Sequence, residues 1–127
     1  KSLFVKNVPF SLIDNRIMDL AIDLLNNPDA NLMTCYRRLE ERVGLDGESG
    51  SKLFSQAFLS SNAPLYWPEL PEAEAKGRAA LFTGVYMAYR NSRAHKENLT
   101  TIDDAIRECL MINQLFILEG EANKRQF

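Results

Sequence analysis

The spacing of the apolar residues constrains the fold of this chain more than any other feature. Over most of the 127 residues, apolar side chains recur every three or four positions, and no segment alternates with period two for long enough to form a strand. Helices joined mostly by short links pack as an all-α bundle. We therefore predict a bundle of about five helices, with an ordered proline-rich loop before the fourth.

Capping residues indicate where these helices start and stop. The first is expected to begin at Asp14 and to stop at an Asn-Asn-Pro sequence, after which Asp29 is placed to cap the second. Gly44 supplies the left-handed residue that commonly ends a helix. The fourth helix is predicted to reach at least Tyr89, and Thr101 opens the last one with a capping-box pattern.

The chain divides into three parts by composition. Residues 1–13 are predicted to form an extended arm, residues 14–119 the helical domain, and residues 120–127 a polar tail. Because the chain does not begin with methionine, we expect it to be part of a longer protein, with the arm leading from a missing N-terminal region. In the proline-rich loop, Tyr66 and Trp67 are expected to pin the backbone to the body of the domain.

Composition excludes several classes of protein. A net charge of −2 argues against general coating of nucleic acid, although it allows a local basic patch. Cys35, Cys109 and a single histidine are too few ligands for a zinc site, so we expect no metal and no cofactor. Two separate reduced cysteines favour a cytoplasmic protein. The apolar runs are too short to cross a membrane, and no membrane partner is expected.

The only histidine lies in the segment YRNSRAHKE, which covers residues 89–97. One interpretation is that basic residues gather there because cations stabilise the C-terminal end of a helix. The other is catalytic. The neutral imidazole of His95 can accept a proton from a ribose 2′-hydroxyl, and the guanidinium of Arg90 can bind two phosphate oxygens as charge develops.

Helical geometry limits how these residues can act together. Side chains five apart diverge by roughly 140° on a regular α-helix, so Arg90 and His95 do not share a face. Asn91 and His95 do, and Asn91 can orient the imidazole. For both charged groups to reach one phosphate, the helix must distort near Ser92 or a second copy must face the first. The second possibility predicts a homodimer with the motif at its interface.

These residues resemble a known family. An arginine followed five positions later by a histidine, near the end of a long helix in a small bundle, resembles the motif of HEPN domains. The resemblance is closer to the Ymh-type bacterial branch, over about residues 30–119. The residues that carry it are Asp46-Gly47, Leu53, Ala57-Phe58, Pro64-Leu65, Gly77, Leu81-Phe82, Gly84, the block Arg90-Asn91-x-Arg93-Ala94-His95 and a following helix over 103–118.

The resemblance implies a role for each motif residue. His95 would be the general base or acid, Arg90 the ligand of the phosphate and transition state, and Asn91 the residue that orients the pair. The candidate RNA-binding residues are Arg93, Lys96 and Arg42. On the second helix, Glu40 and Glu41 either border a cleft at the motif, together with Arg42, or belong to a solvated face with ion pairs four residues apart.

Many HEPN domains are metal-independent ribonucleases of toxin–antitoxin and anti-phage systems. The resemblance therefore implies an endoribonuclease that acts on RNA, with a second copy and an antitoxin or sensor domain as further partners. Two other readings stay open. In the first, the chain is a non-catalytic module that binds RNA or a nucleotide, or only dimerises. The acidic pI favours it, and so does Ser92, which stands where the Ymh-type block has proline. In the second, the chain is a purely structural partner domain.

Overall fold

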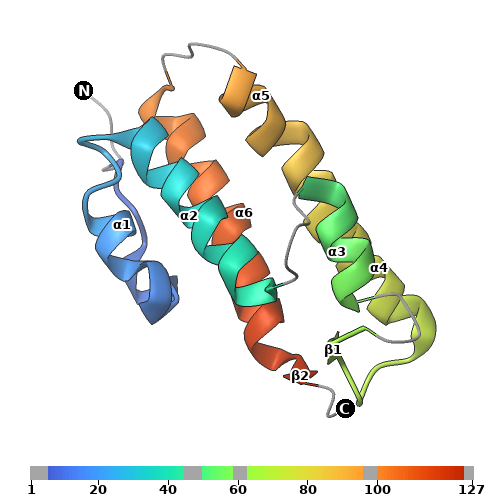
Figure 1. The fold of residues 1–127 in the computed structure, drawn as a ribbon. Helices are drawn as coiled ribbons and strands as arrows, with labels where there is room; N and C mark the ends of the chain where they lie inside the picture. Colours follow the sequence, from blue (N-terminus) through green and yellow to red (C-terminus); the bar gives the residue numbers. More distant parts are fainter. Residues whose placement is uncertain (1–5, 45–49, 59–62, 96–99, 125–127) are drawn as a thin grey trace.

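The computed structural model describes residues 6–44, 50–58, 63–95 and 100–124 and confirms the all-α prediction (Figure 1). Within this described part of the chain, two two-residue strands are the only extended pairing. The elements are η1 (Phe10–Leu12), η2 (Asn15–Ile17), α1 (Met18–Ile22), α2 (Pro28–Val43), α3 (Gly50–Phe58), β1 (Leu65–Tyr66), α4 (Glu72–Val85), η3 (Tyr86–Arg90), α5 (Asn91–His95), α6 (Ile102–Glu121) and β2 (Asn123–Lys124).

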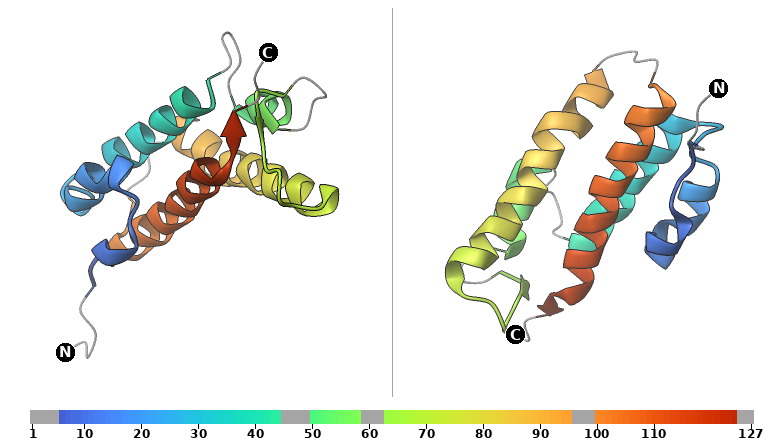
Figure 2. Two further views of the ribbon diagram at one scale, coloured as in Figure 1. Left: turned by 90° about the horizontal axis from the view of Figure 1, so that it is seen from below. Right: turned by 180° about the vertical axis from the view of Figure 1, so that it is seen from behind.

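Two long helices, α2 and α6, lie side by side and run in the same direction at the centre of the bundle (Figures 1 and 2). Helix α1 packs on the outer side of α2, while α3 and α4 pack against each other on the other side of the central pair. The end of α5 and the starts of α2 and α6 therefore lie at one end of the bundle, and the two strands lie at the other.

The start and end of α2 follow from local backbone chemistry. Pro28 occupies the first helical turn, where its missing N–H costs nothing, and Asn27 is at the N-cap position. The prediction that Asp29 caps this helix is therefore wrong, because Asp29 lies inside the first turn and its carboxylate is free to pair elsewhere. Gly44 ends the helix as predicted, at a φ of 64° that residues with a Cβ rarely adopt.

Aromatic side chains join the two halves of the bundle. The rings of Tyr36 on α2 and Tyr86 on η3 meet edge to face, with their centroids 5.1 Å apart. The Tyr86 hydroxyl donates to the Tyr36 carbonyl at 2.8 Å. Trp67 confirms the predicted pinning of the proline-rich loop. Its ring stacks on Phe58 at 4.5 Å, and its Nε1 donates to the carbonyl of Leu118 at 2.9 Å.

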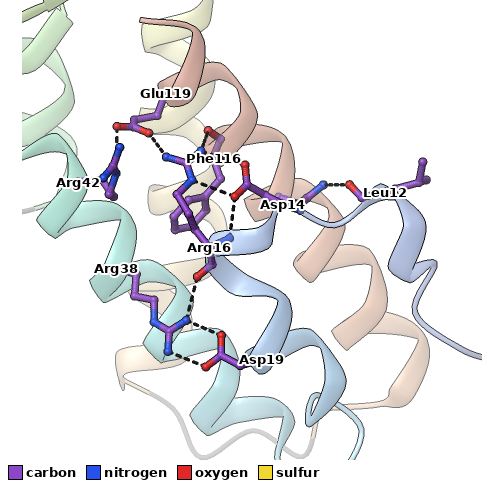
Figure 3. Close-up of polar contacts among 9 residues, drawn as sticks. Leu12, Asp14, Arg16, Asp19, Arg38, Arg42, Phe116 and Glu119 are labelled. Atoms are coloured by element: carbon purple, nitrogen blue, oxygen red, sulfur yellow. Dashed lines mark hydrogen bonds and ion pairs between the residues drawn. The ribbon is translucent and has the colours of Figure 1, made fainter. Parts of the chain in front are cut away.

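An ionic cluster fixes the N-terminal segment to the central helices (Figure 3). Arg16 donates to Asp14, to the buried carboxylate of Glu119 at 2.5 Å, and to the carbonyl of Phe116 at 2.6 Å. The side-chain amide of Asn113 on α6 accepts a hydrogen bond from the Asp14 N–H at 2.7 Å and donates one to the Leu12 carbonyl at 2.8 Å. These contacts bind the segment before α2 to the end of α6.

The described parts of the predicted arm and tail, residues 6–13 and 120–124, are more ordered than the sequence indicates. The segment expected to be an extended arm contains the short helix η1, and both Val8 and Ile13 are buried in the core. The segment expected to be a polar tail begins inside α6. It then continues as β2, where Asn123 pairs with Tyr66 and Lys124 with Leu65.

Candidate functional site at the end of the long helix

The motif follows a defect in the longest helical stretch. Helices α4 and α5, with the π-helical turn η3 between them, form one continuous helix over residues 72–95, the long helix of the bundle. At the end of η3 the Asn91 N–H bonds to the Tyr86 carbonyl five residues earlier. The distortion expected near Ser92 is not seen, because the described backbone is α-helical over Asn91–His95; the π-turn covers Tyr86–Arg90 and so lies before the motif's Arg90–His95 interval. Single π-turns within α-helices occur frequently at functional sites.

Arg90 is directed towards α2, where it meets Glu40. Its Nη2 lies 3.8 Å from Glu40 Oε1, beyond hydrogen-bonding distance, and the Arg90 side chain is 28% exposed. Among the described residues, neither Arg90 Nε nor Glu40 Oε1 has a hydrogen-bond partner. Burial raises the pKa of Glu40, and the positive charge of Arg90 offsets part of this rise. Because Nε is itself buried, an anionic oxygen would reach Arg90 only through the exposed part of its side chain.

The other two motif positions lie on α5. Asn91 is exposed, and His95 follows it by four residues, so both positions belong to one face of the helix. Ser92 and position 95 are three apart and are also neighbours on the helix surface. The structure describes the backbone of His95 but not its side chain, so the predicted contact between the imidazole and Asn91 stays a prediction.

The Arg93 side chain is largely buried, whereas a contact to RNA requires a side chain at the surface. Its side chain is 9% exposed, and all three of its nitrogens are bonded within the protein. Nε and Nη2 bind the two carboxylate oxygens of Glu108 on α6 at 3.1 and 2.6 Å. Nη1 bonds the Asp29 carboxylate and, at 2.9 Å, the Thr100 hydroxyl. Arg93 thus ties α5 to both central helices.

The buried network extends from Arg93 into the core. The hydroxyl of Tyr36 donates to Glu108 Oε2 at 2.8 Å, so this carboxylate is bound from two sides. Burial, followed by the adjacent negative charge of Glu108, raises the pKa of the Tyr36 hydroxyl and keeps it neutral. A carboxylate that is 6% exposed is stable in this position because its oxygens are paired.

Arg42, a further predicted RNA contact, is not brought to the motif. Arg42 is 52% exposed and pairs with Glu119 at 3.4 Å, near the C-terminal end of α6 (Figure 3). Eleven residues separate Glu119 from Glu108, about 16 Å along the helix axis. Arg42 therefore belongs to the ionic cluster around Arg16 rather than to the motif. Lys96 lies outside the described residues.

A cleft opens beside the motif, between the long helix and the first turns of α6. Its volume is about 390 Å³. Tyr89 and Ser92 line one side, Asp104 and Arg107 line the other, and Met111 contributes an apolar surface. Arg93 and Glu108 also reach the cleft wall. The cleft lies within the size range of about 300–1,000 Å³ that small-molecule sites occupy.

Neither a metal centre nor a membrane-spanning helix is found in the described part of the chain. No three side chains of the His, Cys, Asp and Glu types gather there in a way that would hold a metal ion. Among the same residues, no helix is both long enough and apolar enough to cross a bilayer.

The described residues thus form a small helical bundle in which Arg90 and Asn91 lie near the end of a long helix. The chain belongs to the family described as "Protein of unknown function (Hypoth_ymh)", whose model matches residues 31–117. This match confirms the Ymh-type resemblance and agrees closely with the range of about 30–119 expected from the sequence. No curated protein and no solved structure matches the chain.

Three carboxylates of the site have partners that the sequence pattern does not predict. The pattern indicates Glu40 only together with Glu41 and Arg42, and Asp29 as a helix cap, whereas the structure pairs Glu40 with Arg90 and Asp29 with Arg93. No role is predicted for Glu108, although its position in the sequence carries a signal. It follows Ala105 by three positions and precedes Ile112 by four, so it falls on the apolar stripe of α6, where a carboxylate needs a partner.

Proposed function

We propose that this protein is a HEPN-type, metal-independent endoribonuclease that acts in a bacterial defence or toxin system. The observation that carries the proposal is the environment of Arg90. It ends a π-turn, its side chain is 28% exposed, and its Nη2 lies 3.8 Å from Glu40 Oε1, too far for a hydrogen bond. An arginine with free donors beside a histidine-bearing helical turn suits a phosphodiester whose charge rises during reaction.

The proposed chemistry is a transesterification. The imidazole of His95 removes the proton from a ribose 2′-hydroxyl, and the 2′-oxygen forms a bond to the adjacent phosphorus. The bond from phosphorus to the 5′-oxygen breaks, and this oxygen takes up a proton from water, which in turn accepts the proton held by the His95 imidazolium. The products are a 2′,3′-cyclic phosphate and a 5′-hydroxyl. Arg90 stabilises the phosphorane charge, and Asn91 orients the imidazole.

We propose a homodimer as the functional unit, with the motif at its interface. Positions five apart diverge by roughly 140° on a regular α-helix, so one copy does not bring Arg90 and His95 to the same phosphate, and a second copy would supply the missing arginine or histidine. Two glycines support this arrangement. Gly77 and Gly84 are seven apart on one face of α4, and a Cβ at either would meet nothing within 4 Å. Helical glycine costs stability relative to alanine, and close approach of another helix would explain its use.

A non-catalytic nucleotide-binding module is the second candidate. The cleft beside the motif favours it, because Tyr89 and Met111 offer apolar surface and Asp104 and Arg107 offer polar groups. Such a module would bind nucleotides through the cleft and yield no cleaved product.

Incubation with mixed-sequence RNA in EDTA tests the proposal. Wild-type protein is expected to cleave, and Arg90→Ala and His95→Ala are each expected to lose about 10²–10⁴-fold in rate. The matched control is Arg37→Ala, which removes an exposed arginine of α2. Full activity in the Arg90→Ala/His95→Ala double variant would overturn the proposal. A mixture of the two inactive single variants that regains activity would support a site shared between two copies.

A further inference from the structure

The cleft between the long helix and α6 has no role in the chemistry at Arg90 and His95. Its position is nevertheless adjacent to the motif, because Ser92 lines it and position 95 is the next neighbour of Ser92 on the same helix face. A strand of RNA whose phosphate lies at the motif therefore has a nucleotide within reach of this cleft.

The charges around the cleft argue against a phosphate as its ligand. Arg93 and Arg107 are balanced by Asp104 and Glu108, and the partners of Arg93 include a further carboxylate, that of Asp29. Among the side chains that the structure describes, these surroundings carry no excess of positive charge, whereas phosphate sites do. A flat, neutral ring with polar edges suits a cleft that combines apolar surface with a few hydrogen-bonding groups.

Tyr89 and Met111 provide the apolar part of such a site. Tyr89 lines the cleft, and 40% of this residue is exposed. Single-stranded RNA is recognised largely through unstacked bases that pack on aromatic side chains and are then read along their edges. Tyr89 is positioned to receive one of these bases.

Asp104 and Arg107 provide the polar part. They are three apart on the first turns of α6 and form an exposed ion pair at 3.2 Å, which contributes little to stability and is readily replaced by a ligand. The carboxylate accepts two hydrogen bonds side by side, and the guanidinium donates two. Guanine is the base with two adjacent donors, N1–H and the N2 amino group, and two adjacent acceptors, O6 and N7.

The geometry points to a guanine-binding subsite formed by Tyr89, Asp104 and Arg107, which selects the nucleotide next to the scissile phosphate. This inference rests on the proposed ribonuclease function and gives it a sequence preference. Asp104 accepts from the amino edge of the base, Arg107 donates to its O6 and N7, and Tyr89 packs against the ring.

Binding of the four 5′-mononucleotides to the full chain in EDTA, measured by isothermal titration calorimetry, tests the subsite. These ligands lack a 3′-phosphodiester and are not substrates, so their binding is independent of turnover. We expect GMP to bind about tenfold or more tightly than AMP, CMP and UMP, in line with the discrimination of a bidentate contact. Asp104→Asn and Arg107→Gln should each weaken GMP binding about tenfold and leave the other affinities unchanged.

Lys76→Gln is the matched control, because it removes an exposed positive charge from the opposite end of the long helix. Equal affinities for the four nucleotides, no binding at all, or unchanged GMP affinity in both cleft variants would overturn the subsite. RNA cleavage without a preference for guanine would also overturn the subsite, but it would leave the ribonuclease proposal intact. Selective GMP binding by a protein that cleaves no RNA would support the subsite and overturn the ribonuclease.

Discussion

Replacement of Arg93 by alanine tests the buried network most severely. The change removes the charge that faces Glu108, whose side chain is 6% exposed, and leaves that carboxylate with the Tyr36 hydroxyl alone. Breaking one partner of a buried ion pair costs about 3–5 kcal/mol. Domains of this kind unfold with about 5–15 kcal/mol, so the variant should lose a large share of its stability.

Urea denaturation followed by circular dichroism measures this loss. With a denaturant dependence of about 1.5 kcal/mol per molar urea, the midpoint of Arg93→Ala should fall by about 2–3 M. The exposed control Arg37→Ala should change the unfolding free energy by less than about 0.5 kcal/mol. The double variant Arg93→Leu/Glu108→Gln should recover at least half of the loss, because no unpaired charge stays buried at Glu108.

The same experiment separates two roles for Arg93. If it serves as a contact to the RNA backbone, Arg93→Ala should keep its stability, bind RNA more weakly and lower the salt dependence of binding by about one charge. A midpoint within about 0.5 M of wild type, or a double variant no more stable than Arg93→Ala, would refute the reasoning from burial.

Three further predictions follow from other parts of the molecule. Gly84→Ala should raise the unfolding free energy of the monomer by about 0.5–1 kcal/mol and weaken self-association in sedimentation equilibrium; a stronger dimer would contradict the proposed interface. Burial raises the pKa of the Cys35 thiol to about 12 and that of the Cys109 thiol to about 11. Neither thiol should therefore react with iodoacetamide at pH 8 until urea is added. Rapid alkylation of the native protein would show that solvent reaches the core. The hydrogen bonds from Arg16 lower the pKa of Asp14 below 3.8, so their stabilisation is present above about pH 4 and is lost as pH falls through the folded-state pKa. Asp14→Asn should therefore flatten the fall in unfolding free energy below pH 4, and an equal slope in both proteins would exclude this linkage.

The fold was predictable where local patterns determine it. The spacing of apolar residues gave the helices, Gly44 gave the end of α2 through its positive φ, and the Thr101 hydroxyl caps α6 by accepting from the Asp104 N–H. The ordered ends were not predictable in the same way. The segment around Val8 and the strand at Asn123 owe their structure to contacts with residues distant in sequence.

The site was only partly predictable for the same reason. The motif at Arg90 is contiguous and can be recognised by its spacing, but the partners of its neighbour Arg93 come from three separate segments. A basic residue at a helix end has the same local pattern whether it faces solvent or a buried carboxylate. The partner that distinguished these cases, Glu108, lies fifteen residues away on the apolar face of another helix.

The measurement that tests the central claim most directly is the identity of the RNA ends produced in EDTA by wild type and by His95→Ala. If His95 and Arg90 catalyse attack by the 2′-hydroxyl, wild type should leave 2′,3′-cyclic phosphates and 5′-hydroxyls, and His95→Ala should leave neither above background. Cleavage by His95→Ala at the wild-type rate, or wild-type products with 5′-phosphates, would contradict the assignment of this helix end as a ribonuclease site.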